Sequence, residues 1–309
     1  MGILLNNAPY DNDPWVHYLN QYLPDIPVFV YPDVPDVKAV KYAATWDHPA
    51  GDFERYPNLR AILHLGAGMD LIDAQPTLPD VPIVRLVDPE VGLDMAQFAL
   101  YWTLHFQRNF EQYRTLARDS RWDRLDYINS KRYNVAVVGL GLIGTQIAQT
   151  IASNRFKVLG WSRRSQILEG VTNLNGEDGL KRALEHADVV INCLPLNDNT
   201  HHFFDSEKLA WLKQGANIIN ISRGGVFDDT ALIDGLNNGR IGAAALDVFA
   251  VEPLPEDHVY WQMPNVFVTP HMSGATYARS ACRTLADNIE RLEAGEDPFP
   301  IYIPKSKQS

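Results

Sequence analysis

Three side chains in the second half of the chain are of types that together could bind a carboxylate and transfer a proton. Arg223 stands in Ser-Arg-Gly-Gly, where the glycines would let a ligand approach, and its planar fork of donors suits an α-keto carboxylate. His271 follows Thr-Pro, and an imidazole can donate a proton to a carbonyl as hydride arrives. Glu252 could bind the second imidazole nitrogen, which would fix the tautomer and favour the protonated form.

Each of these residues also has a simpler interpretation. Arg223 could be a surface arginine in a turn, and Glu252 could be a turn acid before a proline. The chain has nine histidines, so a single one is weak evidence. Asp247, which ends an apolar run, could accept a hydrogen bond from a nicotinamide carboxamide or merely cap a loop.

A glycine-rich turn between an apolar run and a helical pattern predicts a dinucleotide site. Residues 135–138 lead into Gly-Leu-Gly-Leu-Ile-Gly at 139–144, and a second apolar run follows at 157–161. Gly139 allows the tight turn, Gly141 lets the backbone approach a pyrophosphate, and Gly144 lets the helix pack closely on the strand. The helix N-terminus would face the phosphates. An ordinary turn that binds nothing is the alternative.

The end of the second apolar run indicates which dinucleotide is bound. NAD-binding units usually carry Asp or Glu there, roughly 20 residues on, to accept from the ribose 2′-OH. This chain has Ser-Arg-Arg-Ser at 162–165 instead, and arginine donors match phosphate oxygens. The sequence therefore predicts NADP(H), unless both arginines only form a solvated loop. We expect cofactor contacts from Gly139, Gly141, Leu142, Ile143, Gly144, Ser162, Arg163, Arg164, Ser165, Leu194, Pro195, Ile221, Ser222, Arg223 and Asp247.

A parallel sheet would bring these residues to one edge. Helical patterns separate most of the strand-like runs, which lie at 135–138, 157–161, 188–194, 216–221, 243–248 and 266–269. That alternation predicts a doubly wound parallel sheet, in which ligands bind at the carboxyl ends of the strands. Pro195, Arg223 and His271 follow such ends, and Asp247 lies at one.

The length of 309 residues suggests a second domain before the glycine turn. Short apolar runs at 3–5, 27–31, 39–45 and 59–65 alternate there with Pro, Asp and Gly, as in a small α/β domain. A helical pattern at about 95–117 is apolar all round, which suits a subunit interface or a core helix. A last helix, about 275–295, is expected to return to the first domain.

We thus predict an α/β fold with two Rossmann-like domains. The smaller is a discontinuous, flavodoxin-like substrate domain, 1–93 and 276–309, and the larger is an NADP-binding Rossmann domain, 94–275.

Composition excludes several classes of function. The net charge of −11 argues against a broad basic surface for nucleic acid, and no stretch approaches the length of an apolar membrane span. Two cysteines far apart fit a reducing compartment, and the first residues do not read as a signal peptide, so we expect a cytoplasmic protein. His201 and His202 with Asp205 could suggest a metal, but we favour an exposed loop at a helix start and expect no metal.

These motifs resemble those of the D-isomer-specific 2-hydroxyacid dehydrogenases, and most closely the bacterial A-type glyoxylate/hydroxypyruvate reductases. The likeness covers nearly the whole chain and rests on the glycine turn, Ser222-Arg223-Gly224, Leu-Asp-Val-Phe at 246–249 with Glu252-Pro253, and Thr269-Pro270-His271. It implies that Arg223 binds the substrate carboxylate and carbonyl, that His271 is the general acid/base and that Glu252 supports it. The missing acid at Ser162 sets the chain apart from NAD-using members.

The resemblance also implies a substrate loop and a homodimer. Leu-Gly-Ala-Gly-Met-Asp at 65–70 matches the family's substrate-domain loop, whose backbone N–H groups hold the carboxylate, although from the residues alone it is only a Gly-rich turn. Trp46 matches a tryptophan that limits substrate size. The expected substrate-binding residues are Trp46, Leu65, Ala67, Gly68, Arg223 and His271. Arg121 and Trp122 would reach the site of the partner in the homodimer.

The sequence therefore predicts an enzyme that reduces glyoxylate or hydroxypyruvate with NADPH by hydride transfer, with no nucleic-acid or membrane partner. Two alternatives remain open. A cofactor-sensing, corepressor-like protein on the same fold would keep the same three residues, although this chain lacks long disordered or basic extensions. Another 2-hydroxyacid dehydrogenase specificity, such as 3-phosphoglycerate oxidation, is the second.

Overall fold

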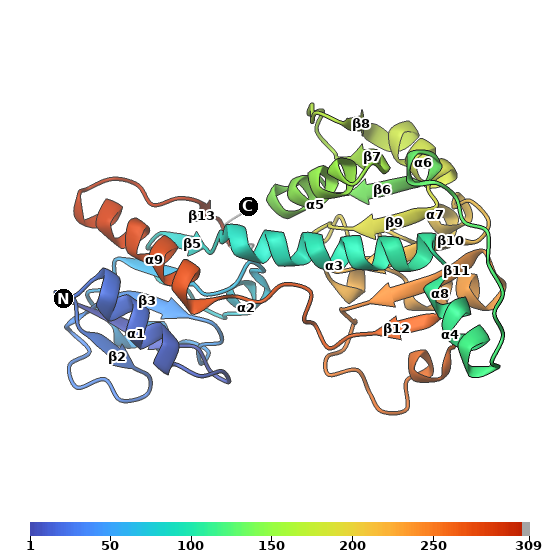
Figure 1. Ribbon diagram of the computed structural model, residues 1–309. Coiled ribbons are helices and arrows are strands. Elements are labelled where there is room, and N and C mark those ends of the chain that lie inside the picture. The colour runs from blue at the N-terminus through green and yellow to red at the C-terminus, as the bar shows by residue number, and fades with distance from the viewer. Residues whose placement is uncertain (305–309) are drawn as a thin grey trace. The chain divides into compact units, whose positions relative to one another are not determined.

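Apolar runs form two sheets in the computed structural model, which describes residues 1–304. Each sheet belongs to its own unit. The first unit comprises Met1–Val91 and the described chain from Thr276 onward, and the second comprises Gly92–Ala275 (Figure 1). Residues 305–309, which end the predicted substrate domain, lie outside the described residues.

The second unit contains a seven-stranded, wholly parallel sheet in the order β12-β11-β10-β9-β6-β7-β8. The chain runs outward from β6 through β7 and β8, and then returns to place β9 on the other side of β6. This reversal makes a topological switch point between β6 and β9, and it confirms the predicted doubly wound sheet. The strands are β6 (Asn134–Val138), β7 (Lys157–Trp161), β8 (Val171–Leu174), β9 (Val189–Asn192), β10 (Ala216–Asn220), β11 (Ile241–Leu246) and β12 (Val266–Val268).

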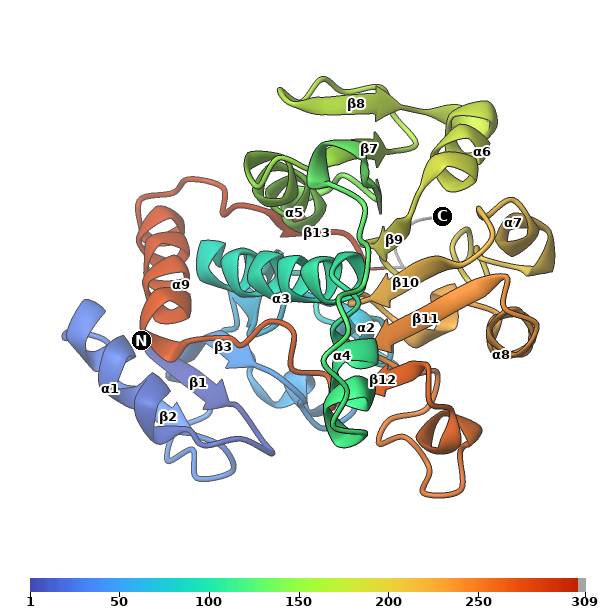
Figure 2. The same cartoon turned by 45° about the vertical axis from the view of Figure 1, so that its right-hand side comes forward.

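Helices cover both faces of this sheet, which explains why its central strands are apolar throughout. In β6, Val135 and Val137 pack in one buried cluster with Ile147, whereas Ala136 and Val138 pack in another with Leu180. The alternation follows the two-residue period of a strand. The helices after the first strand are α5 (Leu142–Ser153), α6 (Gly176–His186), α7 (Ser206–Ala210) and α8 (Asp229–Asn237) (Figure 2).

The first unit contains a six-stranded sheet in the order β13-β5-β4-β3-β1-β2. Its five parallel strands follow the flavodoxin-like order 2-1-3-4-5, and β13 adds to β5 in the antiparallel sense. This confirms the predicted α/β fold class. The strands are β1 (Gly2–Asn6), β2 (Val28–Val30), β3 (Val40–Thr45), β4 (Ala61–His64), β5 (Ile83–Arg85) and β13 (Ile301–Tyr302).

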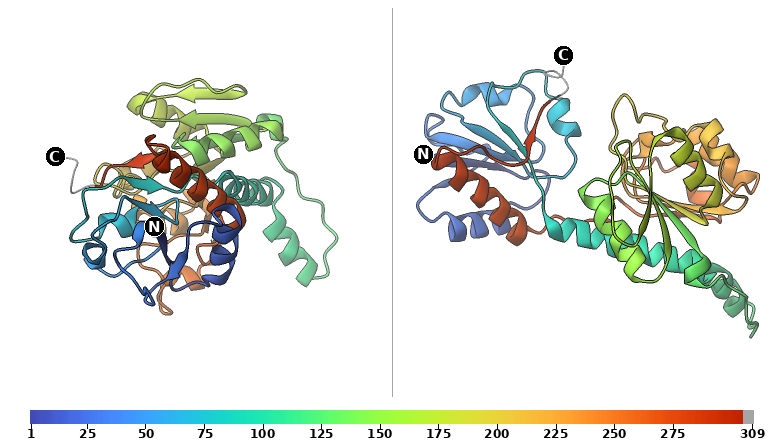
Figure 3. Two further views of the ribbon diagram at one scale, coloured as in Figure 1. Left: turned by 90° about the vertical axis from the view of Figure 1, so that its left-hand side faces the viewer. Right: turned by 90° about the horizontal axis from the view of Figure 1, so that it is seen from above.

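The late helix α9 (Ala278–Glu293) belongs to this first unit and packs beside α1 (Asp13–Tyr22) (Figure 3). Trp15 and Leu19 of α1 share a buried cluster with Leu285 and Ile289 of α9. At the end of α9, the Glu293 carboxylate accepts hydrogen bonds from Tyr42 and Arg60. The last helix predicted from the sequence, α9, therefore packs in the first unit through both apolar and polar contacts.

Several elements differ from the sequence expectation, which did not include β5 and β13. The single helix expected at 95–117 is two helices, α3 (Pro89–Gln107) and α4 (Phe110–Arg118), because Asn109 adopts left-handed backbone with φ 57°. The first begins early because the Asp88 carboxylate accepts a hydrogen bond from the Glu90 N–H at 3.0 Å. Strand β8 was missed, since its residues are only partly buried and form no apolar run. Within residues 1–304 no helix is long and apolar enough to cross a membrane.

Candidate active site

In the second unit, the loops that were predicted to form the site all begin just after a single row of residues that pair side by side across the sheet. In register across the sheet, Trp161 lies beside Val138, and the row continues through Asn192, Asn220, Leu246 and Val268. Because the strands are parallel, the loops that follow this row lie along one edge. The structure therefore brings the predicted cofactor loops to the carboxyl edge of a single sheet. Arg223, Glu252 and His271 lie in loops at the same edge.

His271 and Glu252 form a hydrogen-bonded pair at this edge. The imidazole Nδ1 lies 2.7 Å from Glu252 Oε2, and the other carboxylate oxygen accepts from the Phe249 N–H at 2.9 Å. Burial opposes ionisation of Glu252, but the bonds from His271 and Phe249 and the charge of Arg223 outweigh it and lower the pKa of this carboxyl. The Glu252 carboxylate thus stays ionised and orients the ring.

The backbone of His271 is held in an uncommon conformation. Its φ is 51°, in the left-handed region that side chains other than glycine seldom adopt. Its N–H donates to the backbone oxygens of Asp247 at 2.8 Å and Thr269 at 3.0 Å. Half of the imidazole is exposed, so the ring is fixed at its base and open to a ligand.

Asp247 holds the loop that carries His271. Its side chain is fully buried, and its two oxygens accept from the Thr269 hydroxyl at 2.6 Å, the Met272 N–H at 2.9 Å and the Ser273 N–H at 2.8 Å. These bonds favour the simpler of the two interpretations that the sequence left open, in which the aspartate organises a loop. Its side chain acts on the site through the position of His271.

Arg223 follows β10, and its loop packs directly against the loop that carries Glu252. The guanidinium donates to the Ser222 oxygen at 2.7 Å, and its charge adds a small contribution to the lowered pKa of Glu252, after the hydrogen bonds from His271 and Phe249. Gly224 makes the approach possible, since a Cβ there would lie 1.9 Å from the backbone carbon of Phe249. The glycine after the arginine is therefore required by packing between two site loops.

A buried pair of asparagines, which the sequence analysis missed, ties neighbouring loops together. Asn192 and Asn220 end adjacent strands, and the Asn192 amide donates to the Asn220 oxygen at 3.0 Å. Asn192 Oδ1 also accepts from the Leu194 N–H, and Asn220 Nδ2 donates to the Arg223 oxygen. Polar residues that end otherwise apolar strands were the available signal, because a buried amide must find partners.

The glycine turn between β6 and α5 has the form that a dinucleotide requires. Gly139 has φ 100°, and a Cβ at Gly144 would lie 1.8 Å from the Gly139 oxygen, so both glycines are fixed by the fold. A Cβ at Gly141 would meet no described atom within 4 Å, and its φ of −74° suits any residue. The space above Gly141 thus lies open to a ligand, which fits a pyrophosphate at the helix N-terminus.

The remaining predicted cofactor residues differ in accessibility. Arg163, Arg164 and Ser165 are exposed after β7, and Leu142 and Pro195 are exposed beside the glycine turn and after β9. The side chains of Leu194 and Ile221 are buried in the core, so only their backbone could face a cofactor. Ser222 Oγ donates to the Leu194 oxygen, which joins the loops after β9 and β10.

In the first unit, Trp46 lies against the loop predicted to bind substrate. Its ring stacks on His64 with centroids 5.6 Å apart, and the edge of Tyr10 meets it at 6.1 Å. A Cβ at Gly66 would lie 2.1 Å from the indole, so this glycine makes room for the ring. Leu65 is 1% exposed and contributes to the core, whereas Ala67 and Gly68 are partly exposed.

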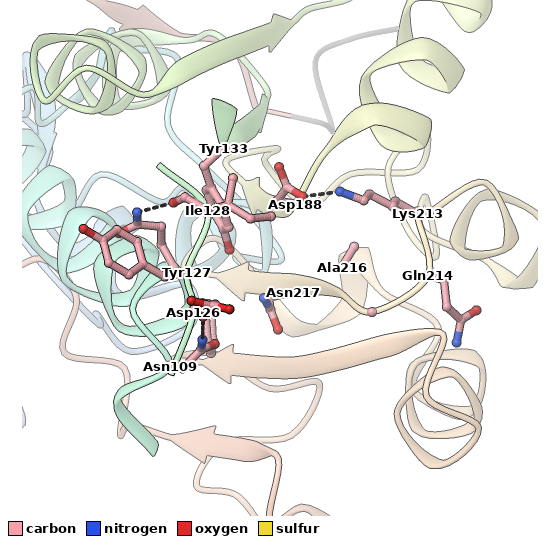
Figure 4. A pocket seen from close by; sticks show the side chains of 13 residues that line it. Asn109, Asp126, Tyr127, Ile128, Tyr133, Asp188, Lys213, Gln214, Ala216 and Asn217 are labelled. Atoms are coloured by element: carbon pink, nitrogen blue, oxygen red, sulfur yellow. Dashed lines mark hydrogen bonds and ion pairs between the residues drawn. The ribbon is translucent and has the colours of Figure 1, made fainter. Parts of the chain in front are cut away.

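Two other features carry no candidate chemistry. A cavity of about 360 Å³ lies at the amino ends of the strands of the second unit, away from the site loops, and its Asp188 pairs with Lys213 (Figure 4). Asp205 caps α7 by accepting from the Lys208 N–H at 2.9 Å. The rings of His201 and His202 stack, and no metal-binding cluster occurs among the residues that the structure describes.

Comparison with known proteins adds three findings. The sequence model described as "D-isomer specific 2-hydroxyacid dehydrogenase, NAD binding domain" matches residues 100–273. Glyoxylate/hydroxypyruvate reductase A of Photorhabdus laumondii subsp. laumondii is 34% identical over 302 residues, which cover 96% of each chain. A D-isomer specific 2-hydroxyacid dehydrogenase from Xanthobacter autotrophicus Py2, solved with NADPH and MES, superposes with a TM-score of 0.95 at 37% identity, covering 99% of both chains.

A second solved structure is similar over almost the same length. It is the NADPH-dependent glyoxylate/hydroxypyruvate reductase of Sinorhizobium meliloti in complex with NADP and sulfate. Its TM-score is 0.92 at 29% identity, with 98% of each chain covered. The likeness thus extends through both units.

Proposed function

The chain belongs to the D-isomer-specific 2-hydroxyacid dehydrogenases, and we propose that within this family it reduces small 2-keto acids, namely glyoxylate and hydroxypyruvate. The protein is an NADP-dependent 2-hydroxyacid dehydrogenase. The His271–Glu252 pair beside Arg223 is the observation that carries the proposal, because it supplies a proton donor, its orienting carboxylate and a cation at one sheet edge.

The cofactor is NADP(H), as in the two solved relatives. We assign the pyrophosphate to the glycine turn, where Gly141 leaves open space, and the 2′-phosphate to Arg163 and Arg164. When bound, the cofactor supplies the hydride that reduces the keto carbon. We thus propose that the second unit, Gly92–Ala275, is the cofactor domain predicted at 94–275, and that the first unit is the substrate domain predicted at 1–93 and 276–309.

The side chains of this protein then have separate tasks. Arg223 binds the substrate carboxylate and carbonyl oxygen and stabilises the negative charge that develops on that oxygen. His271 gives its proton to the same oxygen, and in the reverse direction takes it back. Glu252 is hydrogen-bonded to Nδ1 of the imidazole, so the ring presents Nε2 to the substrate. The assignment of Ala67 and Gly68 to the carboxylate and of Trp46 to substrate size rests on the family resemblance.

A substrate panel tests this function directly. The purified protein is assayed with glyoxylate, hydroxypyruvate, pyruvate and phosphohydroxypyruvate, the keto acid formed by 3-phosphoglycerate oxidation, each with NADPH and with NADH. We expect the highest kcat/KM for glyoxylate or hydroxypyruvate with NADPH. A preference for the phosphorylated acid would support the other dehydrogenase specificity, and no turnover with any keto acid would support a cofactor-sensing binding protein.

A further inference from the structure

Gln166, four residues after Ser162, bonds to both parts of the proposed cofactor site. Its side-chain nitrogen donates to the Leu140 oxygen within the glycine turn at 2.8 Å and to Ser162 Oγ at 3.2 Å. Ser162 Oγ in turn donates to the Arg164 oxygen at 2.7 Å. These hydrogen bonds join the turn after β6 to the arginine loop after β7.

The donors in this network are fully used. A side-chain amide nitrogen carries two hydrogens, and here one goes to Leu140 and the other to Ser162. A hydroxyl has one hydrogen, which Ser162 gives to the Arg164 backbone. Phosphate oxygens need donors, so Ser162 cannot donate to a 2′-phosphate while it keeps this bond. In this arrangement the Ser162 hydroxyl holds the backbone of the loop that carries the arginines.

The rest of this loop has few contacts that could replace these bonds. Ile167 is 91% exposed, and Ser165 and Glu169 are exposed as well. The next anchor is the Asn173 side chain, which bonds to both the N–H and the oxygen of Leu168 at 3.2 Å. Between the end of β7 and Leu168, Gln166 is thus the side chain that fastens the loop to the glycine turn.

We propose that Gln166 is a positioning residue for NADPH selectivity, which fixes the distance between the arginine loop and the glycine turn. The inference rests on the proposed placement of the 2′-phosphate on Arg163 and Arg164. The pyrophosphate and the 2′-phosphate belong to one covalent molecule, so their two binding loops must keep a matching spacing. NADH lacks the 2′-phosphate and so makes no phosphate contact with the arginine loop, and loss of Gln166 should therefore weaken NADPH binding more than NADH binding.

The test measures cofactor binding without any keto acid. Gln166→Met keeps the side-chain length and removes both donors, while Ile167→Ala is the matched control and Arg163→Ala the positive control. Fluorescence titration gives Kd for NADPH and NADH. Because a net hydrogen bond is worth a small factor in binding, we expect the ratio of Kd for NADH to Kd for NADPH to fall about fivefold in Gln166→Met. Ile167→Ala should leave the ratio unchanged.

A second readout needs no cofactor. Amide hydrogen exchange over residues 162–166 should be faster in Gln166→Met than in the wild type, with β6 and α5 unaffected. The inference is overturned if Gln166→Met keeps the wild-type ratio while Arg163→Ala lowers it, and in that case the proposed phosphate site stands. If Arg163→Ala and Arg164→Ala also keep the ratio, the phosphate site is misplaced and both proposals fall.

Discussion

At the residue scale, the Glu252–His271 hydrogen bond orients the proposed proton donor. The pKa of Glu252 is lowered, because the hydrogen bonds that its carboxylate accepts from His271 and Phe249 outweigh the opposing effect of burial. Below that lowered pKa the carboxyl becomes protonated, and its contribution to folding stability is lost as the pH falls. The pair is therefore both an orienting contact and a source of pH dependence.

Glu252→Gln should slow reduction because it weakens the contact that orients His271. A neutral amide oxygen is a weaker acceptor for the imidazole than a carboxylate oxygen is. We expect kcat with glyoxylate to fall about tenfold or more, with the Kd for NADPH unchanged. Initial rates at saturating substrate check this, with Glu256→Gln as a control that removes an exposed charge from the same loop. A kcat equal to that of the wild type would show that Glu252 does not act on the proton donor.

Cofactor choice is also decided at single residues. Replacing Ser162 by Asp and Arg163 by Gln should repel the 2′-phosphate and remove a donor to it, since hydrogen bonds to charged groups are strong. The NADPH/NADH ratio in kcat/KM should fall at least about tenfold. Lys157→Gln, which removes a cation at the opposite end of β7, should leave the ratio unaltered. An unchanged ratio in the double variant would mean that the 2′-phosphate lies elsewhere.

At the element scale, the site depends on loops that pack against one another after one row of strand ends. Gly224 allows the Arg223 loop to approach Phe249, and Asn192 and Asn220 bridge two neighbouring strands. These contacts set the spacing between the loops that carry Arg223 and Glu252. Gly224, Asn192 and Asn220 themselves are not proposed to touch substrate.

Gly224→Ala should therefore damage both stability and activity. The added Cβ would meet the backbone of Phe249 and Ala250 at 1.9 and 2.2 Å, and backbone cannot yield as a side-chain end can. We expect a loss of about 1–3 kcal/mol in unfolding free energy, with a fall in kcat/KM. Gly225→Ala is the matched control, because the nearest atoms to its Cβ would be side-chain atoms, at the flexible end of Leu196 at 3.3 Å and on the His201 ring at 3.8 Å. Equal effects of both changes would refute this packing argument.

Elements with strong periodic signals were predictable from the sequence, and weakly patterned ones were not. The buried strands β6, β7, β9 and β10 read as apolar runs because helices cover both faces of their sheet. Strand β8 lies at the sheet edge, is half-buried and carries no such pattern. The break between α3 and α4 depends on one residue, Asn109, in the left-handed conformation. The spacing of apolar residues does not predict such a conformation.

At the scale of the whole molecule, parallel topology explains why the candidate site could be predicted from one sequence. Strand ends collect at one edge, so reading the residue after each strand gathers Arg223, Asp247 and His271 although they are far apart in the chain. Residues that support the site through hydrogen bonds to neighbouring loops could not be predicted this way. Gln166 and Asn220 reveal their roles only through hydrogen bonds that depend on three-dimensional spacing.

Assembly is a further property of the whole chain. From the family resemblance we expect a homodimer, in which Arg121 and the fully exposed Trp122 approach the partner. Light scattering after size-exclusion chromatography should then give twice the chain mass of 34.8 kDa. A mass of a single chain at assay concentration would contradict the expectation.

The central claim is that His271 protonates a 2-keto acid during reduction by NADPH. The most direct measurement compares kcat/KM for glyoxylate between the wild type and His271→Asn, because asparagine tolerates the left-handed backbone found at this position. NADPH titration checks that the variant still folds and binds cofactor. We predict a loss of about a hundredfold to ten-thousandfold in kcat/KM with NADPH affinity preserved. Turnover close to the wild type on every keto acid tested would contradict the claim.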